Sequence, residues 1–169
     1  MNQHRPPATS QYDDDFYAWT QQQAKALRAL HKHAGTLPVQ VDLSAIAEEI
    51  EDLGKADLNT VIGLTQQILI HLIKAVSAPH ALPLAHWRVE ATTFSVTLGR
   101  RYVPSMRRKI DMQEIWDGAV RVAGATLEAH HGVLARNLPK TCPFTLEDVV
   151  SSDFRFDDAL ARLDGLLGR

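Results

Sequence analysis

The carboxylates of residues 48–52 are the densest set of groups in this sequence that could do chemistry. On a helix, Glu48 and Glu49 each lie about one turn from Asp52. Carboxylate pairs at that spacing can bind Mg²⁺ or Mn²⁺ if other elements add further ligands. Two more carboxylates of this type lie near the N-terminus: Asp13 and Asp15. The alternative, which we favour, is an acidic helix face in contact with water.

A second candidate is the pair His71 and Lys74, which share one face of an otherwise apolar segment. A buried lysine needs an acidic partner, because an unpaired charge in the interior is very costly. We therefore expect Lys74 within salt-bridge reach of a carboxylate from residues 48–52 or 13–15. A fold-back of the chain would be required, since in one straight helix Glu49 and His71 would lie roughly 33 Å apart. We favour a structural ion pair over a catalytic His-Lys-Glu site.

Other reactive residues have no suitable partner nearby in the sequence. Cys142 has no neighbouring histidine or other base, so a small buried side chain is the better interpretation. A local basic patch could meet phosphate or the acidic run of a second copy, but it has no interleaved aromatic residues, so nucleic acid is not expected. The patch consists of Arg100, Arg101, Arg107, Arg108 and Lys109. We predict no catalytic set and no cofactor, because no phosphate-binding loop, Gly-x-Ser-x-Gly or Cys-x-x-Cys motif occurs.

Composition narrows the class of protein. The chain has 169 residues, of which 45% are hydrophobic, and this favours one globular domain over a disordered chain. The net charge is −2, from 18 basic and 20 acidic residues, so no general attraction to nucleic acid or to anionic membranes is expected.

The sequence also predicts a compartment. A single cysteine excludes an internal disulfide, and the N-terminus lacks the apolar core of a signal peptide. The longest apolar stretch, residues 68–76, is broken by His71 and Lys74 and is far shorter than the ~20 residues of a membrane span. We expect a cytoplasmic protein without membrane association.

Periodicity predicts helices throughout the first half of the chain. Residues 1–11 are polar and are expected to be flexible. A first helix begins near Asp13–Asp15 and ends by Gly35 and Pro38, and one apolar face is expected to be buried. That face comprises Phe16, Trp19, Gln23, Ala26, Leu27 and Leu30.

A second helix is expected to begin at Asp42, as N-cap, and to end at Gly54, with a third over residues 57–77. A single helix of about 35 residues would span roughly 52 Å, which exceeds the roughly 40 Å diameter of a compact domain of this length. We therefore predict a break at Gly54. The third helix is apolar on nearly every face, so it should be central and the most buried.

The second half is predicted to hold a loop over residues 78–85 and helices over 87–102 and 104–130. Thr145 and Asp148 have the spacing of a capping box for a short helix, and an amphipathic tail follows from Asp157. The fold class is therefore all-α: a helical bundle of four main helices with short terminal ones, in a single domain over residues 12–169.

Several segments, in order over about residues 12–154, resemble an uncharacterised bacterial family catalogued as domain of unknown function 29. The matching motifs are Tyr12-Asp-Asp-Asp-Phe-Tyr-Ala-Trp19, the acidic segment 42–54, His71-Leu-Ile-Lys74, Trp87-Arg88, Pro104-Ser-Met106 and Pro139-Lys-Thr-Cys-Pro-Phe-Thr-Leu-Glu147. The resemblance implies a helical bundle and no established activity. Two departures occur: Ala75 replaces the tryptophan of the family pattern, and residues 92–95 lack its arginine.

No reaction centre assembles from the sequence, so we favour a non-enzymatic interaction module that binds a protein partner or forms a homo-oligomer. The alternative is a metal-dependent hydrolase or nuclease that uses the clustered carboxylates and His71.

Overall fold

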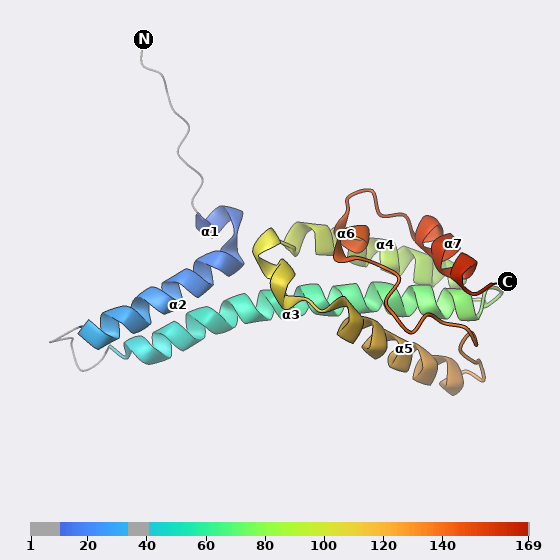
Figure 1. The fold of residues 1–169 in the computed structure, drawn as a ribbon, viewed down its shortest axis with the longest axis horizontal. Coiled ribbons are helices and arrows are strands. Elements are labelled where there is room, and N and C mark those ends of the chain that lie inside the picture. Colours follow the sequence, from blue (N-terminus) through green and yellow to red (C-terminus); the bar gives the residue numbers. More distant parts are fainter. Residues whose placement is uncertain (1–10, 34–40, 169) are drawn as a thin grey trace, which may run out of the picture. The chain divides into compact units, whose positions relative to one another are not determined.

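The computed structural model describes residues 11–33 and 41–168, and every regular element within these ranges is a helix (Figure 1). The prediction of an all-α fold is confirmed. The chain divides into two compact units. The first unit comprises Met1–Asn59 with Val103–Met106, and the second comprises Thr60–Tyr102 with Arg107–Arg169. A single domain over residues 12–169 stays a prediction.

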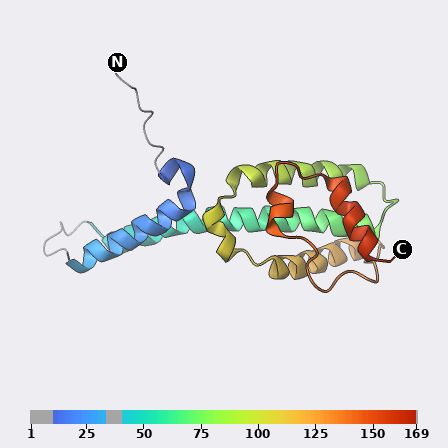
Figure 2. The same cartoon turned by 45° about the horizontal axis from the view of Figure 1, so that its top comes forward.

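The first unit contains α1 (Gln11–Asp14), α2 (Phe16–His33) and the N-terminal part of α3 (Leu43–Ser77), with α2 alongside α3 in Figures 1 and 2. Asp15 caps α2, since its Oδ1 accepts a hydrogen bond from the Ala18 amide at 2.8 Å. Asp42 caps α3 as predicted, because its Oδ1 accepts from the amides of the second and third residues after it. The predicted end of the first helix at Gly35 and Pro38 lies outside the described residues.

The predicted break at Gly54 is wrong, because α3 is one helix of 35 residues. Gly54 is buried, and a Cβ atom at this position would lie 2.1 Å from Thr20 Oγ1. Because Gly54 has no side chain, α2 can approach α3 closely at this point. Gly54 is therefore a packing residue inside the helix and not a residue that ends it. The size argument assumed one compact domain, whereas the contacts form two units.

The buried face of α2 also differs from the predicted one. Tyr17, Thr20 and Ala24 are buried in the first unit. In the predicted stripe, Phe16 and Trp19 are half-buried and the C-terminal members are largely exposed. Helical periodicity identified an apolar face of α2, but a different face packs on α3. The small residues at positions 20 and 24 allow that face to approach α3 more closely.

The second unit is built on the C-terminal part of α3. α4 (Leu84–Arg101) and α5 (Met112–Ala129) flank it, with α6 (Leu146–Val150) and α7 (Phe156–Leu166) nearby (Figure 2). This part of α3 is predicted to be the most buried helix, and this is confirmed: Ile68, Leu69, Leu72 and Ile73 are fully buried. By length and composition α3 could cross a membrane, but 61% of its most apolar window is buried in the protein. A core helix passes the same test.

Helix boundaries in the second unit follow from local capping. The predicted loop and the following helix are both present, although α4 begins at Leu84, inside the predicted loop, and residues 104–130 are not one helix. A 3₁₀ helix η1 (Pro104–Lys109) is followed by α5, because the Asp111 side chain accepts hydrogen bonds from the Gln113 and Glu114 amides. The predicted capping box of Thr145 and Asp148 is present at α6.

Candidate functional site

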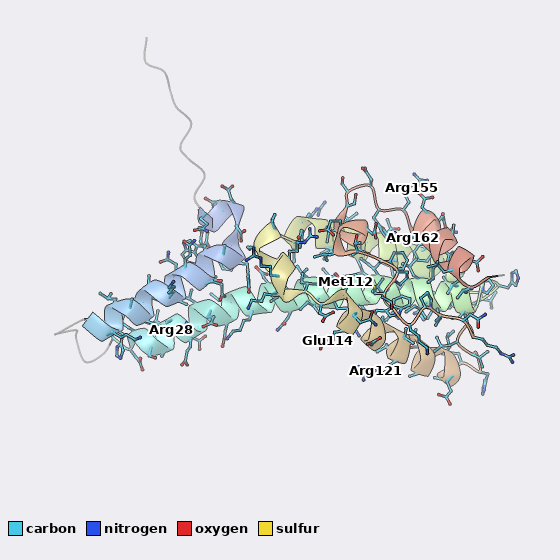
Figure 3. All side chains as sticks on the ribbon, viewed as in Figure 1. Arg28, Met112, Glu114, Arg121, Arg155 and Arg162 are labelled. Carbon is cyan, nitrogen blue, oxygen red and sulfur yellow. The ribbon has the colours of Figure 1, made fainter. Side chains whose placement is uncertain are left out.

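The predicted carboxylates do not converge on a common point in the first unit. Glu48 and Glu49 are exposed on α3, and Asp52 pairs with Lys55 Nζ at 2.9 Å. Between them, Glu51 forms an ion pair with Arg28 of α2, which Figure 3 labels.

The two N-terminal carboxylates have local surroundings of their own. Asp13 lies in the short helix α1. Asp15 caps α2 and accepts a hydrogen bond from Ser105 Oγ at 2.7 Å. Among the residues that the structure describes, no three His, Cys, Asp or Glu side chains are grouped so that they could hold a metal ion.

His71 and Lys74 are buried on the C-terminal part of α3, at 4% and 7% exposure. The carboxylate that acts on both is Glu90 of α4, and not one from residues 48–52 or 13–15. The expected partner was wrong because it required a fold-back at Gly54, and α3 does not break there.

Glu90 is shared by two imidazoles. His71 Nε2 lies 3.3 Å from Glu90 Oε2, and His86 Nε2 lies 3.2 Å from the same oxygen. His86 and Glu90 are four residues apart on α4, so they lie on one face of that helix. The two helices therefore bring a carboxylate and two imidazoles together in the second unit.

His71 is neutral at neutral pH. Burial lowers its pKa to about 4, with a further lowering from the Lys74 charge, and this outweighs the opposite effect of Glu90. Its ring stacks on Phe94 with centroids 5.8 Å apart, and its Nδ1 atom is buried without a hydrogen-bond partner.

Lys74 extends its ammonium over an aromatic ring. Its Nζ lies 4.8 Å from the centroid of the Trp87 ring, a cation–π arrangement. Burial lowers the pKa of Lys74, and the Glu90 charge opposes this shift. Among the described residues, no carboxylate lies at salt-bridge distance from Nζ.

Lys74, Trp87 and Glu90 line a cavity of about 590 Å³, which we call the Lys74 cavity. Its walls come from α3, α4, α5 and the loop that precedes α4. Its polar lining residues are Lys74, His86, Glu90, Thr126 and His130, and its apolar ones are Ala78, Ala81, Leu82, Pro83, Trp87 and Leu127. A larger hollow of about 820 Å³ lies beside α5, but its charged lining residues are exposed. The Lys74 cavity is therefore the better candidate site.

Three members of this site were missed from the sequence: His86, Trp87 and Glu90. The signal was the i, i+4 spacing of His86 and Glu90. Trp87 was noted only as part of a family motif. The fold-back expected at Gly54 directed Lys74 toward the carboxylates of residues 48–52, whereas the acid beside His71 and Lys74 comes from α4.

A model of the family described as "Domain of unknown function DUF29" matches residues 11–155. The chain belongs to this family. It is also similar to an alpha-helical protein of unknown function from Rhodospirillum rubrum, with 36% identity and a TM-score of 0.86, over 92% of this chain and 99% of that one. No curated protein matches the sequence significantly. The match places Lys74, Trp87 and Glu90 within the DUF29 region.

Proposed function

We propose that this DUF29 chain is a non-enzymatic binding module whose Lys74 cavity takes a small organic acid with an apolar body. One observation carries this proposal. Lys74 is buried at the cavity and has no ion pair with a described carboxylate. An anionic ligand would form an ion pair with its ammonium.

The charges around the cavity favour an anion over a cation. Glu90 Oε2 is already engaged by the imidazoles of His71 and His86, whereas the Lys74 ammonium lies over the Trp87 ring and has no ion pair with a carboxylate of the described residues. Lys74 itself is buried, so a ligand carboxylate would pair with an ammonium that is shielded from bulk water, where such a contact is stronger than at the surface.

The walls favour an apolar or aromatic body. Leu82, Pro83, Trp87 and Leu127 give the cavity a mostly apolar lining. A volume of about 590 Å³ lies within the range typical of sites for small organic molecules. Mostly apolar walls with a few convergent polar groups are the usual composition of such sites.

The rival function, a metal-dependent hydrolase, has less support. It requires Asp13, Asp15 and the carboxylates of residues 48–52 to meet His71. His71 instead lies beside Glu90, and no grouping of the described side chains meets the needs of a metal ion. A Mn²⁺-dependent thermal shift in the intact protein would revive this function.

The test is calorimetric titration of the full chain with phenylacetate, and with uncharged phenylacetamide as the matched ligand. We expect phenylacetate to bind at least about tenfold more tightly than the amide, which is worth about 1.4 kcal/mol. Lys74→Met should abolish this preference and leave folding neutral or slightly more stable, because it removes a buried charge.

Lys55→Met is the matched control, since it removes an exposed lysine from the same helix. It should leave binding unchanged. Equal affinity for phenylacetate and phenylacetamide would contradict the proposal. It would also be contradicted if none of benzoate, phenylacetate and octanoate binds at millimolar concentration.

A further inference from the structure

Lys74 differs from every other lysine of this chain in its surroundings. It is buried, whereas the side chains of the other lysines are exposed on the surface. These exposed residues are Lys25, Lys32, Lys55, Lys109 and Lys140. Lys74 also lines the Lys74 cavity, so the one amine that is held out of water stands at the wall of a ligand-sized space.

The surroundings of this amine favour its uncharged form. Burial lowers the pKa of Lys74, and Glu90, whose charge opposes this shift, is engaged by the imidazoles of His71 and His86. An uncharged amine has a free lone pair and can attack a carbonyl carbon, whereas an ammonium cannot. A lysine desolvated in an apolar pocket is the usual form of an amine that makes an imine in proteins.

The same cavity holds groups that can transfer protons. Glu90 and His86 both line it, and Glu90 Oε2 lies 3.2 Å from His86 Nε2. The His86 side chain is 67% exposed, so its imidazole can exchange protons with water and pass them to the carboxylate. Imine formation needs such a supply, because the oxygen of the carbonyl group must leave as water.

We propose that Lys74 binds a 2-oxo acid with an apolar body as a reversible imine, an inference that rests on the Lys74 cavity being the binding site proposed above. The Lys74 nitrogen adds through its lone pair to the C2 carbonyl carbon. It gives up one proton while the carbonyl oxygen takes one, and a carbinolamine results. The hydroxyl group then accepts a proton from the Glu90–His86 pair and leaves as water while the C=N bond forms. Nothing is oxidised or reduced, and hydrolysis releases the ligand unchanged.

Charge selects a 2-oxo acid over an uncharged ketone. The nitrogen of the protonated imine keeps a positive charge, and no carboxylate of the described residues forms an ion pair with Lys74. The carboxylate next to C2 of a 2-oxo acid supplies a negative charge beside that nitrogen. Leu82, Trp87 and Leu127 line the cavity and give the rest of the ligand apolar contacts.

Reductive trapping in the full chain tests the imine, with phenylpyruvate as the probe. Cyanoborohydride reduces an imine to a secondary amine that does not hydrolyse, and peptide mass mapping then locates the modified lysine. We expect the adduct at Lys74 and its loss in Lys74→Met. Lys55→Met, which removes an exposed lysine of the same helix, should leave it unchanged. No adduct at Lys74 in the wild-type chain, or equal adducts at the exposed lysines, would overturn the inference, and neither result depends on the folding of a variant.

Lys74→Arg separates the imine from the ion pair of the proposed function. Arginine keeps the positive charge, but its guanidinium does not form an imine. The adduct should therefore be lost while phenylacetate still binds more tightly than phenylacetamide. A wild-type chain that prefers phenylacetate but gives no adduct would overturn the imine and leave the proposed function standing. An adduct at Lys74 without that preference would support the imine and contradict the proposed ion pair.

Discussion

In the N-terminal half of α3, residues 43–59, the side chains of Glu48, Glu49 and Asp52 are exposed. In the C-terminal half, residues 60–77, the ionisable side chains His71 and Lys74 are buried. One continuous helix thus carries ionisable groups in two different environments.

The causes of the pKa shifts show what this difference means. The pKa of Glu51 in the N-terminal half is lowered, mainly by its hydrogen bond with Arg28. In the C-terminal half, burial is the main cause for His71 and Lys74, and each is pushed toward its neutral form. Exposed pairs contribute little to stability, whereas buried ionisable groups are costly and need another reason to be present. This is why the buried half is the better place for a binding site.

Glycine gives the largest expected contrast between the halves. Gly54→Ala should destabilise the first unit by about 2 kcal/mol, because the new Cβ meets Thr20 Oγ1. Gly63→Ala is the matched control in the C-terminal half, where nothing lies within 4 Å of the added Cβ. It should stabilise α3 by about 0.5–1 kcal/mol, as alanine does in a helix.

Urea denaturation measures both variants, and hydrogen exchange of α2 locates the loss. Faster exchange in α2 is expected for Gly54→Ala alone. Adding Thr20→Ala should restore part of the lost stability, because it removes the oxygen that clashes. Equal effects of the two glycine substitutions would show that Gly54 is not a close-approach site.

His71 gives the next largest effect, and it depends on pH. Its folded-state pKa of about 4 lies below the ordinary 6.5, so the unfolded chain takes up the proton first as the pH falls. The stability that its neutral form contributes is full above pH 6.5 and is lost on acidification toward pH 4, by about 1–2 kcal/mol between pH 7 and pH 5. Urea denaturation between pH 7 and pH 5 measures this loss.

His71→Phe keeps a ring beside Phe94 and should flatten the pH dependence in this range. The charges of Lys74, Glu90 and His86 all act on His71. His86→Phe is the control, because it makes the same substitution at a histidine that is exposed. A slope unchanged in His71→Phe would assign the acid sensitivity to other groups.

Much of the fold could be predicted, because local signals decide it. Helical periodicity identified the long helices, and the capping side chains of Asp42 and Thr145 marked two helix starts correctly. Gly54 misled the prediction, because glycine serves both helix ends and close helix approach, and only the position of Thr20 distinguishes the two.

The candidate site was only half predictable. The isolated polar pair His71 and Lys74 in an apolar segment was visible, and burial of both follows from that setting. Their partner Glu90 was not, because which face of α4 meets α3 depends on packing between helices and not on a local pattern. The sequence pointed to the nearest acidic run, whereas the site takes its carboxylate from α4.

The N-terminal half should be more sensitive to its cap than to its surface charges. Asp42→Ala removes the acceptor for the amides of Ser44 and Ala45, each 3.0 Å from Oδ1. We expect a loss of about 1 kcal/mol, measured by urea denaturation. Asp42→Ser, which retains a capping oxygen, should recover most of it. A neutral Asp42→Ala would mean that water replaces the cap.

The smallest expected effect is at Glu51. This residue tests the claim that exposed ion pairs in the N-terminal half of α3 contribute little to stability. Glu51 pairs with Arg28 across the two helices and with Lys55 along α3 at 3.4 Å. Because both basic partners are exposed, Glu51→Gln should cost less than about 0.5 kcal/mol, and added salt should reduce the difference from wild type. The lowered pKa of Glu51 implies that this small contribution is present above its ordinary pKa and is lost as acid protonates the folded carboxylate. A loss of several kcal/mol in Glu51→Gln would show that the exposed half also depends on a specific ion pair, and the contrast between the halves of α3 would no longer hold.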